Sequence, residues 1–92
     1  MINSSARLRI SDNVIGTRVE DEVVLLNFDA GKYFGLKGVA ARMWELLEGG
    51  TTVDAIVAVL MEEFDAPSAA VARADVCKTL ERLLQEELIR EG

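Results

Sequence analysis

The hydrophobic pattern changes its period near residue 37. Before that point three runs, at 14–20, 23–28 and 32–36, are rich in β-branched, aromatic and aliphatic residues, with turn formers at 21–22 and 29–31. The pattern therefore predicts a three-stranded antiparallel meander over about 14–36. Leu8 and Ile10 add either a short strand or an arm before it.

After residue 37 the apolar positions follow a helical period and predict three helices, over about 38–48, 52–64 and 68–87. Gly49-Gly50 and the segment 65–68 separate them. The first helix has an apolar stripe made of Val39, Met43, Leu46 and Leu47, with Trp44 at its edge. In the second, Thr51 followed by Asp54 predicts a capping box. Its apolar face comprises Val53, Ile56, Val57, Leu60, Met61 and Phe64.

The third helix has a wide apolar face. Placed at 100° per residue, its apolar positions span an arc of roughly 160°, whereas packing on a core requires a stripe of roughly 100°. These positions are Ala72, Val76, Cys77, Leu80, Leu83, Leu84 and Leu88. Either the sheet and the other helices cover the whole arc, or one flank of it forms the wall of an open groove.

Length and composition predict one α+β domain over residues 1–92, since half of the residues are hydrophobic and 28% are charged. The sequence has neither a basic, apolar start nor a stretch long enough to span a membrane, so we expect a cytoplasmic protein. The formal net charge is −6 and the arginines are scattered. We therefore expect no basic stripe, no nucleic-acid partner and no membrane partner.

The sequence lacks the residue types and motifs that catalytic sites commonly use. There is no histidine, and the single cysteine, Cys77, lies in a helical apolar pattern typical of a core residue. The carboxylate pairs Glu62-Glu63 and Glu86-Glu87 fall on polar helix surfaces or near helix ends. No phosphate loop or calcium loop is present. We expect no catalytic residue, no cofactor and no metal, and hence a binding domain instead of an enzyme.

The third predicted strand is a candidate binding element. It is short and aromatic, and a helix follows it directly, which favours a place at the edge of the sheet. An open edge can accept a peptide as an added strand. Gly35 either lets a visiting backbone approach closely or only relieves twist.

Three segments carry a resemblance to a known family: 25–29 and 31–36, then 40–47, then Asp75-Val76 with Leu80, Leu83, Leu84 and Leu88-Ile89. Their order and spacing are similar to those of the PqqD-like family, whose fold is winged-helix-like, with a three-stranded antiparallel sheet followed by three helices. The resemblance implies an adaptor that binds the leader of a ribosomally made, modified precursor peptide and presents it to a modifying enzyme or leader peptidase.

The resemblance also implies where the leader lies, as an antiparallel strand on the third strand and against the third helix. The edge would be Tyr33, Phe34, Gly35 and Leu36, and the wall would be Val76, Thr79, Leu80 and Leu83. The sequence does not decide which flank of the helix faces the peptide, so Cys77 and Leu84 are the alternative wall.

The resemblance identifies the partner enzyme less directly than the binding site. Lys37 stands where the family usually has asparagine, which leaves the subfamily open. A lasso-peptide leader peptidase is favoured, and a radical enzyme of the kind that makes the cofactor PQQ is the alternative. A winged-helix DNA-binding regulator, a purely structural subunit and a homodimer through the same edge remain further alternatives. We expect leader binding to depend little on salt.

Overall fold

The computed structural model describes residues 3 and 5–92. Its larger sheet contains β2 (Val14–Val19), β3 (Glu22–Asn27) and β4 (Lys32–Lys37), in the order β2-β3-β4 with both pairings antiparallel. This is the predicted meander, and β4 lies at the predicted edge. A two-residue turn joins β2 to β3, and Glu20 there has a φ of 58°. The predicted winged-helix-like α+β fold is confirmed.

The two faces of this sheet differ because side chains alternate along each strand. Val23 and Leu25 of β3 are buried, and Phe34 and Leu36 of β4 pack beside them on the same inner face. Helix α1 (Gly38–Leu47) covers that face with Met43 and other apolar residues. The outer face carries Ile15 and Tyr33, both more than half exposed.

The described residues also form three helices, whose bounds lie within two residues of the predicted ones: α1, α2 (Val53–Glu63) and α3 (Ala69–Gln85). The Ser68 hydroxyl caps α3 by accepting a hydrogen bond from the Val71 N–H. The predicted capping box at Thr51 is wrong. Thr51 belongs to a strand, and Thr52 is the residue that caps α2, through the N–H of Ala55.

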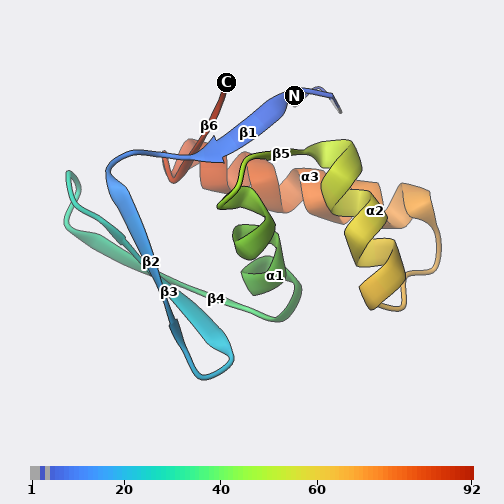
Figure 1. Ribbon diagram of the computed structural model, residues 1–92, viewed down its shortest axis with the longest axis horizontal. Coiled ribbons are helices and arrows are strands. Elements are labelled where there is room, and N and C mark those ends of the chain that lie inside the picture. Colours follow the sequence, from blue (N-terminus) through green and yellow to red (C-terminus); the bar gives the residue numbers. More distant parts are fainter. Residues whose placement is uncertain (1–2, 4) are drawn as a thin grey trace.

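A second small sheet lies outside the predicted meander. It consists of β1 (Arg7–Ile10), β5 (Thr51–Thr52) and β6 (Ile89–Glu91), in the order β5-β1-β6. Leu8 and Ile10 therefore lie in a strand. Figure 1 shows β1 and β6 beside one another, so β1 lies next to the last residues of the chain. This sheet holds the C-terminal end of α3 against the start of the chain.

Trp44 lies in the core, with about 1% of its surface exposed, although the sequence pattern placed it at the edge of an apolar stripe. Gly16 on β2 explains the difference, because an ideal Cβ built there would lie 2.6 Å from the indole Nε1. The missing side chain makes room for the ring beneath the sheet. Conversely, Val39, Met61 and Phe64 were expected in apolar stripes but are each more than a third exposed.

This contact gives a test of the fold. Gly16→Ala should lower the free energy of unfolding by about 1–3 kcal/mol, because the new methyl group would force the indole or the strand to move. Gly49→Ala is the matched control, since nothing lies within 4 Å of the corresponding position. Urea denaturation of both variants checks this. Equal free energies of unfolding for the two variants would contradict the packing described here.

Candidate functional site

The backbone of β4 has an open side, and the hydrogen-bond pattern shows which groups lie on it. The Phe28 N–H donates to the Asn13 carbonyl, and the Gly31 N–H donates to the Asn27 carbonyl. Even-numbered residues of β3 therefore pair with β2 and odd-numbered ones with β4. On β4, the register then directs the backbone groups of Lys32, Phe34 and Leu36 toward β3. Those of Tyr33, Gly35 and Lys37 point to the open side.

The turn before β4 is held by one side chain. The Asn27 side-chain oxygen accepts hydrogen bonds from the backbone N–H groups of Asp29 and Ala30, at 3.0 and 3.1 Å. Asn27 is itself buried. Since these bonds are local and partly shielded from water, they fix the point at which the chain reverses and hence the register of β4.

A cleft of about 530 Å³ lies between β4 and α3. Backbone and side chains of β4 form one wall, and one flank of α3 forms the other. The residues that line it are Phe34, Gly35, Leu36, Lys37, Ala40, Lys78, Thr79, Arg82, Leu83, Glu86 and Leu88. The cleft therefore combines an open strand edge with a helix surface, which is the arrangement that strand addition requires.

Five of the eight predicted site residues line this cleft: Phe34, Gly35, Leu36, Thr79 and Leu83. The side chain of Tyr33 lies on the outer face of the sheet and is 72% exposed, so only its backbone faces the open edge. Val76 and Leu80 lie in the core instead. The alternative wall residues, Cys77 and Leu84, are packed against the core and do not line the cleft.

Gly35 has a neighbour that the sequence did not indicate. A Cβ at this position would meet the carboxylate of Glu22, which lies across the outer face of the sheet. The space left by the missing side chain is thus occupied from within the chain. Gly35 contributes its backbone to the cleft.

The sequence pattern missed the charged lining of the cleft. Lys78 and Arg82 are four residues apart on one flank of α3, and both line the cleft, as does Lys37 at the end of β4. The alternation along β4 places the side chain of Lys37 toward the outer face, opposite Glu22 on β3. The scattered arginines predicted no basic stripe, and the fold brings three cationic residues, two of them lysines, to the lining of one cleft. Helical spacing could have paired Lys78 with Arg82, but only the tertiary structure brings Lys37 to them.

An apolar hollow of about 290 Å³ adjoins the cleft and shares Ala40 and Thr79 with it. The exposed side chains of Val39, Phe64 and Val71 lie along it. This hollow explains why part of the predicted apolar faces of α1 and α2 is not buried. It also extends the apolar surface available next to the β4 edge.

An ion-pair network joins the helices at the other side of α1. Arg42 of α1 donates two hydrogen bonds to Glu63 of α2, both at 2.8 Å, and a longer one to Glu45. The hydrogen bonds from Arg42 lower the pKa of Glu63, and those same bonds raise the pKa of Arg42. These side chains are each only about a third exposed and are mutually paired, which is the pattern of a structural contact.

Among residues 3 and 5–92, no three His, Cys, Asp or Glu side chains are placed to hold a metal ion together. A search of the same residues finds no helix with the length and hydropathy needed to cross a membrane.

The family model for coenzyme PQQ synthesis protein D (PqqD) matches residues 22–89, which include β3, β4 and all three helices. The chain belongs to the PqqD family. Two solved structures are similar to this PqqD-family chain. One is TbiB1 in complex with the TbiA(beta) leader peptide, with a TM-score of 0.85 and 36% identity over 89% of this chain and 94% of that one.

The other is a lasso peptide synthetase B1 complexed with its leader peptide, with a TM-score of 0.81 and 19% identity over 90% of this chain and 96% of that one. The likeness at 19% identity concerns the fold. No curated protein matches the sequence of the chain.

The open edge of β4 should be detectable by amide exchange in the chain without any ligand. Because the N–H of Gly35 points away from β3, its hydrogen should exchange with solvent at least about tenfold faster than those of Phe34 and Leu36. Amide exchange followed by NMR measures this directly. Equal protection of Gly35 and Phe34 would mean that the edge is already paired or that the register differs.

Proposed function

We propose that this PqqD-family chain is a non-catalytic adaptor that binds the leader region of a ribosomally made precursor peptide and presents the precursor to a processing enzyme. The observation that carries the proposal is the open edge of β4 beside the cleft along α3. The leader-peptide complexes of the two similar structures support the same role.

In this proposal the leader adds as an antiparallel strand to β4. Its backbone pairs with the free groups of Tyr33, Gly35 and Lys37. Alternate leader side chains then enter the cleft between Phe34 and Leu36 on one side and Thr79 and Leu83 on the other. The remaining leader side chains lie on the outer face, near the side chain of Tyr33.

Each main-chain hydrogen bond contributes about 1 kcal/mol net, and apolar side chains in the cleft contribute the rest. The leader loses conformational freedom when it becomes a strand, which offsets part of this gain. We therefore expect dissociation constants between about 1 nM and 1 μM. Main-chain pairing supplies affinity without reading sequence, so the cleft side chains set the choice of leader.

The enzyme that receives the bound precursor is proposed to be a lasso-peptide leader peptidase. One similar structure is a lasso peptide synthetase B1, and both are complexes with a leader peptide, which supports this type. The family description, PQQ synthesis protein D, supports a radical enzyme as the second candidate. Copurification of the chain with each candidate enzyme encoded in the same gene neighbourhood distinguishes the two.

Strand addition predicts a periodic response to changes in the peptide backbone. Methylation of single backbone nitrogens along a synthetic leader should weaken binding by about tenfold at every second position of the paired segment. At the positions between, whose N–H groups point away from β4, affinity should stay within about twofold. Calorimetric titration measures each peptide.

Only the peptide changes in these titrations, so a loss of affinity cannot come from misfolding of the protein. A peptide that binds without any two-residue period would contradict strand addition. Complete failure of the unmodified leader to bind would contradict the adaptor role itself.

A further inference from the structure

Helix α3 has an open strand edge on each of its two flanks. Besides β4, the three-residue strand β6 lies at the end of its own sheet. The Ser11 N–H donates to Leu88 and the Gly92 N–H donates to Arg7, so the backbone groups of Arg90 pair with β1. Those of Ile89 and Glu91 point to the open side. A further hollow, of about 750 Å³, lies between β6 and α3 and is called the β6 hollow below.

The β4 cleft and the β6 hollow have linings of opposite charge. The β4 cleft is lined by three cations, Lys37, Lys78 and Arg82, and by one carboxylate, Glu86. The β6 hollow is lined by three carboxylates, those of Glu81, Glu87 and Glu91, and by one cation, Arg90. The chain as a whole is acidic, with a formal charge of −6, so the β4 cleft differs in sign from the average surface.

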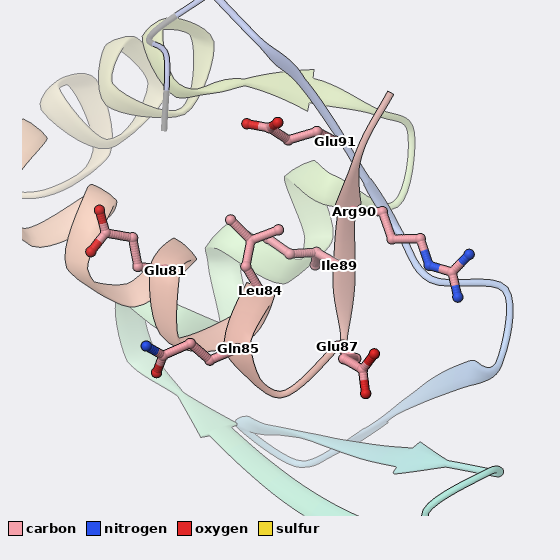
Figure 2. A pocket seen from close by; sticks show the side chains of 7 residues that line it. All are labelled: Glu81, Leu84, Gln85, Glu87, Ile89, Arg90 and Glu91. Carbon is pink, nitrogen blue, oxygen red and sulfur yellow. The ribbon is translucent and has the colours of Figure 1, made fainter. Parts of the chain in front are cut away.

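Figure 2 shows how the β6 hollow is arranged. Leu84 of α3 and Ile89 of β6 meet at its centre, and the side chain of Glu91 extends toward the helix. Arg90 extends from the other side of β6, away from α3. The one cation therefore does little to neutralise the interior of the hollow. The C-terminal end of α3 adds partial negative charge nearby.

The cations of the β4 cleft lack partners within the described part of the chain. Arg9, Arg18, Arg42 and Arg73 each form an ion pair with an aspartate or glutamate. No such ion pair involves Lys37, Lys78 or Arg82 among the described residues. A peptide that covers the cleft removes the cations of Lys78 and Arg82 from water, which is unfavourable unless the peptide supplies negative charge.

From these observations we infer that the leader segment that binds along β4 is acidic. The opposite charges of the β4 cleft and the β6 hollow direct this segment to β4 and away from β6. The inference rests on the proposed function. Lys78, Arg82 and Glu86 follow one another at four-residue intervals along α3. The leader carboxylates therefore lie beside Lys78 and Arg82, toward the middle of the helix and away from Glu86.

This inference changes the expected salt dependence. Contacts between exposed charges weaken as ionic strength rises, because the screening length falls from about 10 Å at 0.1 M salt to about 3 Å at 1 M. Leader binding should accordingly weaken by about threefold to tenfold between these concentrations. The sequence alone predicts little salt dependence, because it does not show that Lys78 and Arg82 line the cleft beside β4.

The test uses the full chain and the leader of the precursor peptide encoded in its gene neighbourhood, with dissociation constants measured by calorimetry at low and high salt. Lys37→Gln, Lys78→Gln and Arg82→Gln should each weaken binding by about two- to fivefold and reduce the salt dependence. Arg82→Lys keeps the charge and should keep most of the affinity, which separates charge from packing. Lys32→Gln and Arg90→Gln are matched controls outside the cleft and should have no effect.

Leader variants complete a double-mutant cycle. Replacing each leader carboxylate by its amide should weaken binding to the wild-type chain, and the loss should shrink in Lys78→Gln or Arg82→Gln for the carboxylate that faces that residue. A leader that binds with equal affinity to all charge variants at all salt concentrations would overturn the inference and leave the adaptor role intact. A leader segment without carboxylates would overturn it as well. No binding at any salt concentration would instead contradict the proposed function.

Discussion

The position of the β4 edge depends on the packing of Trp44 against Gly16, which has no side chain to displace the indole. Through it, α1 lies against the inner face of the β2-β3-β4 sheet, and the indole is almost completely buried there. Helix α1 follows β4 directly, so its position fixes where the edge strand ends. The open edge then lies beside α3 with a cleft between them.

The alternation of hydrogen bonds gives β4 two separate roles. The backbone groups of Phe34 and Leu36 hold the strand to β3, and their side chains face the inner side of the sheet. The groups of Gly35 and its alternate neighbours are available to a partner. Binding a peptide therefore does not require any native backbone bond to break, which keeps the site preformed. The charged residues on α3 can then set specificity independently of the strand pairing.

Local sequence patterns predicted the meander, the three helices and the edge position of β4, because each depends on neighbouring residues. The strands β5 and β6 could not be found this way, since they contain two and three residues and form only by pairing with distant β1. Likewise, the wide apolar arc of α3 did not reveal its rotation. The structure buries Leu80 in the core and leaves Thr79 in the cleft.

The proposed function depends on the pairing of a leader peptide with the open edge of β4. Amide exchange of the chain saturated with the leader tests it most directly, because each edge has its own reporter. If the leader pairs with β4, the N–H of Gly35 becomes as slow to exchange as that of Phe34, while those of Ile89 and Glu91 do not change. Protection that appears at Ile89 and Glu91 with Gly35 unaffected would contradict it.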